Sequence, residues 1–208
     1  MRRTSRPGAP RYGRGSKEQV GRDGACLVFA DETGAGTDPP VRRTWGRKGR
    51  TPLIARSRRH RRRVNAVGWL CVDPLQGTVR LVYTAQHRPI TQHDLPALID
   101  RVHAQVGVPV VLIWDNHSSH RGARMREELA ARPWLSVVHL PTYAPELNPV
   151  EALWSHLKRV LANRAFRGVD ELEKVLRSHL RSVQKRPGLL RGFIRSVGLD
   201  PDSFPSIT

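Results

Sequence analysis

Short apolar runs and helical repeats alternate along the chain from residue 25 onward. Continuous apolar runs of this kind are typical of buried strands. They predict strands at 25–31, 64–72, 78–83, 108–114 and 135–140. Apolar residues spaced three or four positions apart predict helices. These lie at about 95–106, 121–131, 149–161 and 169–183. We expect turns at 32–40 and a further short strand at 41–46.

Two helix starts carry recognisable capping residues. Thr91 is expected to cap the helix that begins near Leu95, and Asn148 followed by Pro149 starts the helix at 149–161. The order of elements is three strands, helix, strand, helix, strand and then helices. This order predicts an α/β fold in which a mixed central sheet is flanked by helices.

The composition points to a polyanionic partner. The 208 residues include 38% hydrophobic residues, enough for the core of one ordinary domain. The formal net charge is +18, and a protein this basic usually meets nucleic acid. Arginines outnumber lysines by 31 to 5, so GC-rich codons are a second explanation for part of the charge.

The basic residues are concentrated toward the N-terminus. We interpret residues 1–24 as a flexible basic arm, 25–185 as the folded domain and 186–208 as a C-terminal tail. The run RSRRHRRR at 56–63 is either a solvated charge run or a contact for DNA phosphates. The candidate DNA-binding residues are Arg58, Arg59, Arg61, Arg62, Arg63 and Lys158.

Several classes of protein are disfavoured. No apolar run approaches the ~18 residues of a membrane span, and the basic N-terminus lacks the apolar core of a secretory signal. Cys26 and Cys71 lie inside apolar runs and cannot form a disulfide framework or a metal knuckle. We therefore expect no membrane partner and a cytoplasmic location.

Three acids occupy positions where sites form. Asp31 and Asp115 each end a predicted strand, and Glu151 lies in the first turn of a predicted helix. Three converging carboxylates suit Mg²⁺ or Mn²⁺, and two such ions can promote phosphodiester chemistry. Each acid also has a purely structural interpretation. Asp31 can start a turn, Asp115 can end a strand, and Glu151 can complete a capping box with Asn148.

Three segments around these acids resemble one family. They are VFADETG at 28–34, VVLIWDNHSSH at 110–120 and LPTYAPELNPVEALWSHLK at 140–158. They look like the three blocks of a DDE transposase of the mariner-like superfamily, in its bacterial insertion-sequence six-thirty branch. The third block is the most specific. WGRKG at 45–49 is similar to a further segment that such enzymes carry between the first two blocks.

The resemblance implies an RNase H-like fold and cut-and-paste DNA transposition. It implies Asp31, Asp115 and Glu151 as the catalytic and metal-binding triad, and positional roles for Asn116 and His120. It also implies two Mg²⁺ or Mn²⁺ ions, transposon-end and target DNA as partners, a homo-oligomer when active, and a bacterial, nucleoid-associated location.

The front of the chain departs from this family, whose members begin with paired helix-turn-helix modules. Only 24 residues precede the first predicted strand. We therefore expect a catalytic domain alone, either a split-frame product with an upstream helix-turn-helix subunit or a decayed fragment. The alternative function is an inactive or regulatory DNA-binding remnant. An RNase H-like nuclease acting on RNA–DNA hybrids fits the fold but not the third block.

Overall fold

The computed structural model describes residues 24–38, 41–45, 47–49, 62–73, 75–117, 120–142 and 144–202. Nearly all of the expected arm at 1–24 lies outside the described residues, as do Arg58, Arg59 and Arg61. Most of the predicted catalytic domain is described, and so are all three acids.

Five strands form one mixed sheet. They are β1 (Cys26–Gly36), β2 (Arg63–Asp73), β3 (Thr78–Gln86), β4 (Val110–Trp114) and β5 (Leu135–His139). Their order across the sheet is β3-β2-β1-β4-β5. The first three strands are antiparallel, whereas β4 pairs parallel to β1 and to β5. The predicted mixed sheet is confirmed, and β2 and β3 form a hairpin within it.

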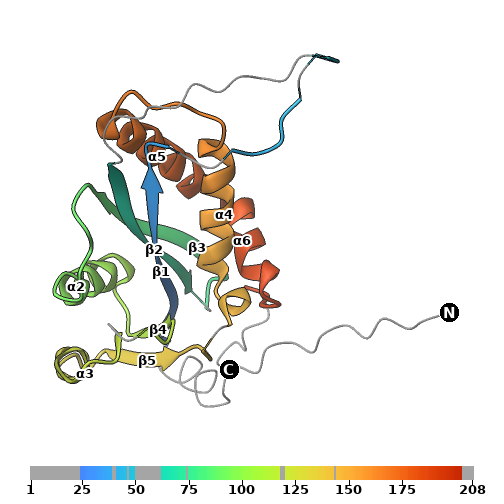
Figure 1. Ribbon diagram of the computed structural model, residues 1–208. Helices are drawn as coiled ribbons and strands as arrows, with labels where there is room; N and C mark the ends of the chain where they lie inside the picture. The colour runs from blue at the N-terminus through green and yellow to red at the C-terminus, as the bar shows by residue number, and fades with distance from the viewer. Residues whose placement is uncertain are drawn as a thin grey trace.

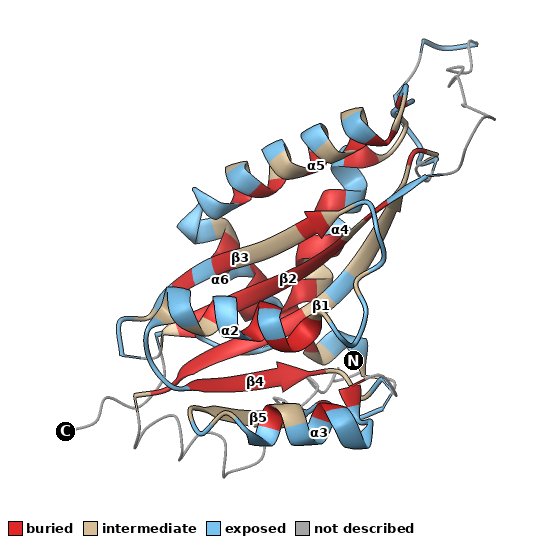
Figure 2. Cartoon of the chain, turned by 90° about the vertical axis from the view of Figure 1, so that its left-hand side faces the viewer, coloured by how far each residue is buried: buried red, intermediate tan, exposed pale blue. Residues whose placement is uncertain are grey.

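Helices cover both faces of the sheet (Figure 1). α2 (Leu95–Val106) and α3 (Ala123–Ala130) lie on one face. α4 (Pro149–Leu161), α5 (Val169–Gln184) and α6 (Pro187–Ser196) lie on the other. A short 3-10 helix, η2 (Pro145–Leu147), precedes α4. Burial follows this layering, because the sheet is largely buried while each helix keeps an exposed outer face (Figure 2). No helix among the described residues has the length and apolar character needed to cross a membrane.

The alternation of side chains along β1 decides which face its acid occupies. Leu27 and Phe29 belong to the core beneath α4, α5 and α6, whereas Cys26 and Val28 belong to the core beneath α2 and α3. Successive strand residues point to opposite faces. Asp31 therefore projects from the face that α4 covers.

A glycine on β2 lets α4 approach this part of the sheet closely. Gly68 pairs with Asp31 across the β1–β2 ladder. A Cβ at Gly68 would lie 2.9 Å from ring carbons of Trp154, which is buried on α4. Any larger residue here would separate α4 from the sheet beside Asp31.

β1 is longer than its apolar pattern predicts. Residues 32–36, expected to be a turn, continue β1 and pair with residues 63–67 of β2. This part of the strand is mostly half-buried and its sequence ETGAG carries little apolar signal, so it depends on backbone pairing with β2. The strand predicted at 41–46 is also wrong, since residues 41–45 have no regular secondary structure.

The start of α2 also differs from the prediction. Its N-cap residue is Asp94 and not Thr91. The Asp94 carboxylate accepts hydrogen bonds from the Thr91 backbone N–H at 2.8 Å and from the Thr91 hydroxyl at 2.9 Å, and it pairs with Arg88. Thr91 therefore holds the N-cap residue Asp94 in place, because the Asp94 side chain turns back toward the loop that contains Thr91.

The expected C-terminal tail at 186–208 is contradicted over much of its length. Residues 187–196 form α6, which packs on α4, α5 and β3. Leu190, Phe193 and Ile194 are buried in the core on the α4 side of the sheet. The helix begins directly after α5, and its Pro187 at the first helical position suits a start. The apolar residues of this segment thus complete the layer that holds α4.

Candidate active site

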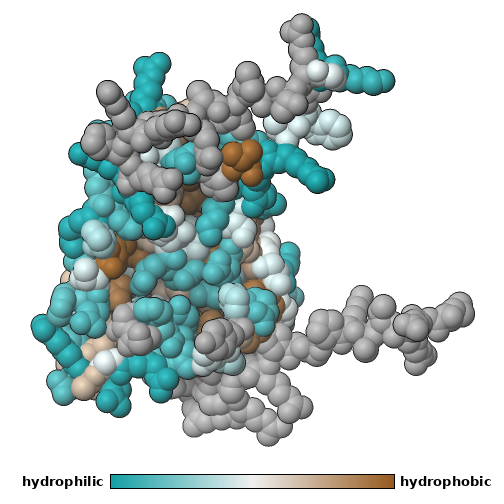
Figure 3. Space-filling model, in the orientation of Figure 1, coloured by the Kyte–Doolittle hydropathy of each residue, from teal (hydrophilic) through white to brown (hydrophobic). Residues whose placement is uncertain are grey.

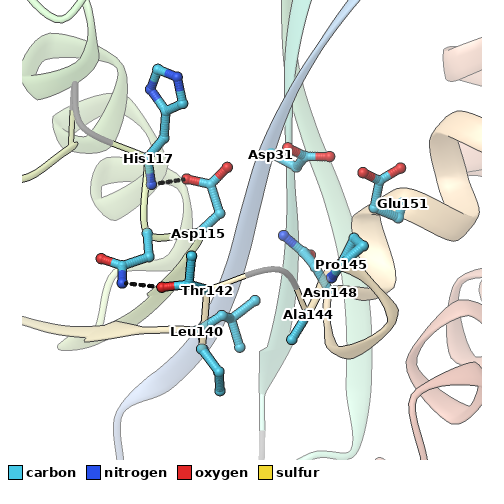
Figure 4. Close-up of a pocket in the computed structure, with 11 residues that line it drawn as sticks. Asp31, Asp115, His117, Leu140, Thr142, Ala144, Pro145, Asn148 and Glu151 are labelled. Carbon is cyan, nitrogen blue, oxygen red and sulfur yellow. Dashed lines mark hydrogen bonds between the residues drawn. The ribbon is translucent and has the colours of Figure 1, made fainter.

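Three carboxylates line one pocket. Asp31 comes from β1, Asp115 directly follows β4, and Glu151 lies in the first turn of α4. The β1–β4 ladder ends with Phe29 opposite Ile113. Two more residues in the same register place Asp31 beside Asp115. The pocket has a volume of about 370 Å³, and all three side chains lie around it (Figure 4).

Glu151 does not form the capping box that its spacing with Asn148 allows. That motif needs the Asn148 backbone N–H as donor, and this N–H instead donates to the Pro145 carbonyl at 3.0 Å. The Asn148 side chain alone caps the helix, accepting from the Val150 N–H at 3.1 Å. Glu151 instead lines the pocket. Glu146, the nearby acid in η2, does not line it.

Asp31 is held in a setting that disfavours its charge. Burial raises the pKa of its carboxyl group to about 7, and the neighbouring charge of Glu151 contributes in the same direction. Asp115 adds a smaller repulsion. Glu151 and Asp115 thus repel a charge on Asp31, and a bound cation would relieve this repulsion.

Asp115 has the opposite bias. Its Oδ1 lies 2.7 Å from Nδ1 of His120 and accepts a hydrogen bond from the His117 backbone N–H at 3.1 Å. The hydrogen bond with His120 lowers the pKa of Asp115. One oxygen of Asp115 is therefore fixed by the protein, in a side chain that remains 48% exposed.

His120 is buried behind the acids. Its ring stacks on Trp114 with centroids 3.7 Å apart, and its Nε2 lies 3.4 Å from Oε1 of Glu32. Burial lowers the pKa of His120, but interactions with Asp115 and Glu32 outweigh burial and raise it to about 9. His120 is thus a cation between two carboxylates, which agrees with a positional role. Glu32 was missed from the sequence, although it stands beside Asp31 in the first block.

Asn116 ties the end of β4 to the loop that leads to α4. Its Nδ2 donates to the Thr142 hydroxyl at 3.1 Å, and both residues line the pocket. This contact joins segments that hold Asp115 and Glu151. A positional role for Asn116, implied by the resemblance, fits this contact.

The predicted DNA-binding residues that the structure describes are exposed and lie at different distances from the three acids. Lys158 is exposed on α4, seven residues after Glu151. Arg62 and Arg63 are exposed where β2 begins. Arg63 pairs with Gly36, five residues beyond Asp31 on β1, which at 3.4 Å per residue is about 17 Å along the strand. Hydrophilic side chains predominate on the face shown in Figure 3.

The donor set of the pocket fits hard divalent cations. Among the described residues, no three Asp, Glu, His or Cys side chains converge closely enough to ligate a single ion. Mg²⁺ normally needs no such cage, since it binds through one or two carboxylates together with water and substrate phosphates. Asp31, with Asp115 on one side and Glu151 on the other, offers pairs of this kind.

Comparison with known proteins places the chain in a family. A family profile described as DDE superfamily endonuclease matches residues 26–173, a span that contains all three acids. The chain belongs to the DDE superfamily endonucleases. No curated protein matches this DDE superfamily chain.

Solved structures agree on the fold of this DDE superfamily endonuclease. The Mos1 strand transfer complex matches with a TM-score of 0.62 and 18% identity over 91% of this chain. The Mos1 mariner paired end complex with Mn matches with a TM-score of 0.56 and 20% identity over 83% of this chain. The catalytic domain of Mos1 mariner transposase matches with a TM-score of 0.55 and 17% identity over 83% of this chain. The predicted RNase H-like fold is confirmed.

The matches differ in how much of each Mos1 chain they cover. The aligned region spans 54% of the chain in the strand transfer complex, 56% in the paired end complex with Mn, and 77% in the catalytic domain. This DDE superfamily chain thus spans about half the length of the first of these structures.

Proposed function

We propose that this DDE superfamily endonuclease is the catalytic domain of a mariner-like transposase of the bacterial insertion-sequence six-thirty branch. It would cleave DNA strands and join a 3′-hydroxyl to target DNA in cut-and-paste transposition. The observation that carries the proposal is the pocket that Asp31, Asp115 and Glu151 line together. The family match over residues 26–173 supports the nuclease part.

The proposed roles follow from where each side chain is held. Asp31 and Asp115 hold the metal ions, and Glu151 completes the second site from α4. Mg²⁺ or Mn²⁺, when bound, activates a water or 3′-hydroxyl and neutralises charge at the scissile phosphate. His120 keeps one Asp115 oxygen in a fixed orientation through the 2.7 Å contact. The two carboxylates on either side of Asp31 favour two ions.

DNA is the proposed substrate and partner. Lys158 lies on the α4 surface beyond Glu151, where it would meet a phosphate next to the scissile bond. Arg62 and Arg63 would contact the duplex farther along, with Arg58, Arg59 and Arg61 on the adjoining segment. The Mos1 structures include a strand transfer complex and paired end complexes, one with Mn and one with Mg. By analogy with these Mos1 structures, we propose that this chain binds DNA, uses divalent metal ions and forms a homo-oligomer when active.

The remaining parts of the proposal concern the cellular setting. We place the protein at the nucleoid, and we propose that a helix-turn-helix subunit from an upstream frame recognises the transposon ends. The flanking DNA tests this directly, since inverted repeats and an upstream frame of that type are expected beside the gene.

A strand-transfer assay tests the chemistry. A pre-cleaved transposon end and a target duplex are supplied with Mg²⁺ or Mn²⁺. Joining is expected to stop with a chelator and with Asp115→Asn, because an amide cannot supply the anionic ligand oxygen. Joining that persists in chelator would refute the mechanism. DNA binding without any cleavage or joining by the intact chain would favour the alternative of a regulatory remnant.

Glu151→Gln separates metal binding from helix stability on one preparation. The Asn148 side chain caps the first turn of α4 and Glu151 does not. The free energy of unfolding of Glu151→Gln is therefore expected to lie within ~1 kcal/mol of wild type, the typical cost of losing a cap. Joining is expected to fall by more than ~100-fold, beyond the usual effect of an outer-shell residue. A variant that joins DNA at the wild-type rate would remove Glu151 from the triad.

A further inference from the structure

A buried amide connects the two elements that carry Asp31 and Glu151. The Asn148 side chain is buried, with 4% of the residue exposed. Its Nδ2 donates to the Ala30 carbonyl on β1 at 2.8 Å, and its Oδ1 accepts from the Val150 N–H on α4 at 3.1 Å. Each hydrogen bond thus ends on the residue that directly precedes one of the acids.

We propose that Asn148 is a positioning residue that sets the separation and orientation of Asp31 and Glu151 for metal binding. This assignment rests on the proposed function. Asn148 also lines the pocket, and its two side-chain hydrogen bonds end on the backbone of β1 and of α4.

The place of the contact on β1 explains why a side chain is needed there. The ladder between β1 and β4 ends at Phe29 opposite Ile113. Ala30 is the next residue, and the Asn148 amide meets its carbonyl just beyond the last paired position. Asn148 therefore continues the support of β1 where its pairing with β4 has ended, at the residue before Asp31.

The backbone of Asn148 is equally constrained. Its N–H donates to Pro145 at 3.0 Å, and its carbonyl accepts from the Glu151 N–H at 3.1 Å. The side chain and the main chain of one residue therefore connect η2, the first turn of α4 and β1. A shift of Asn148 would displace Glu151 relative to Asp31.

An amide is required because the side chain must donate and accept at once. Aspartate and serine are both good helix caps, so both retain the acceptor for Val150. Aspartate has no donor for the Ala30 carbonyl at a pH where it is ionised, so the comparison is made above the pKa that burial gives to a carboxyl group here, and serine is too short to maintain both contacts. Asn148→Asp and Asn148→Ser thus keep the cap and lose the connection to β1.

A matched control exists on the far part of the sheet. Gln184 on α5 donates its Nε2 to the Leu81 carbonyl on β3 at 2.8 Å. Gln184→Glu removes an amide donor from a strand carbonyl by the same chemistry as Asn148→Asp. It does so at a site outside the pocket lining.

The experiment measures Mn²⁺ binding to the full chain without DNA, by calorimetry, together with melting curves. Both Asn148 variants are expected to bind Mn²⁺ at least about 10-fold more weakly than wild type, the scale seen for groups that orient metal ligands. Gln184→Glu is expected to stay within about 2-fold. Asn148→Asp also tests the direction of the change in Mn²⁺ affinity. A new carboxylate that acted only through its charge would tighten Mn²⁺ binding.

The outcomes separate this assignment from the proposed function. If wild type binds Mn²⁺ and either Asn148 variant binds it equally well or more tightly, the positioning role is refuted while the proposed function stands. The role is also refuted if affinity falls in proportion to melting temperature across all three variants. If wild type binds no Mn²⁺ and joins no DNA, the proposed function fails and this assignment falls with it.

Discussion

Asp31→Asn is expected to stabilise the metal-free protein at pH 8. In the folded chain, burial and the charge of Glu151 raise the pKa of Asp31 to about 7 from an ordinary value of 3.8. Between these two pH values the folded state keeps a proton that the unfolded state has lost. The stabilisation from this group is therefore complete below about pH 4 and is lost as the pH rises through 7.

The magnitude follows from the size of the shift. A difference of about three pKa units corresponds to about 4 kcal/mol. Because the Asp31 side chain keeps some contact with solvent, we expect about half of this, or about 2 kcal/mol. For a domain of this size that difference raises the melting temperature by about 4–8 °C.

Thermal unfolding in chelator at pH 5, 6, 7 and 8 measures the effect. The wild-type protein and Asp31→Asn are expected to differ least at pH 5 and to separate further as the pH rises to 8. Glu127→Gln, which changes an exposed acid on α3, is expected to leave the pH profile unchanged. Saturating Mn²⁺ is expected to reverse the order, since it stabilises only the protein that binds it.

One result would refute a destabilising charge on Asp31. If Asp31→Asn melts at or below the wild-type temperature at pH 8 in chelator, the buried charge carries no cost. The pocket would then hold its three acids without the repulsion that we assign to it, and the case for a cation there would lose its electrostatic basis.

Three further predictions concern the packing and the surface around the site. Gly68→Ala is expected to cost about 1–3 kcal/mol and to lower metal-dependent joining, because the new methyl would meet Trp154 at 2.9 Å and push α4 away. A full-rate variant would contradict this. Phe193→Ala is expected to lower the free energy of unfolding, measured in denaturant, by about 3 kcal/mol because Phe193 lies in the core. A loss below about 0.5 kcal/mol would show that α6 contributes little to the core. Lys158→Ala is expected to weaken duplex binding uniformly and to reduce the salt slope by about one, and an unchanged slope would remove it from the interface.

Local pattern was sufficient for most of the elements and for naming the three acids as candidates. Buried strands and amphipathic helices carry their own periodicity, so β2, β4, α2, α4 and α5 were predicted close to their observed bounds. The three sequence blocks also carried the family. The same local rules failed where no apolar signal exists, as in the outer half of β1, which is maintained by pairing with β2.

The tertiary structure decided how the acids are arranged. Asp31 and Asp115 are far apart in the chain, and their proximity depends on the parallel register of β1 and β4. The closeness of Glu151 depends on Gly68, which admits Trp154 to the sheet, and on the Asn148 contact with Ala30. Sequence by itself determined which residues were available as ligands. Contacts between distant segments determined their arrangement, because burial, pairing register and close packing depend on which segments meet in space and not on the order of neighbours in the chain.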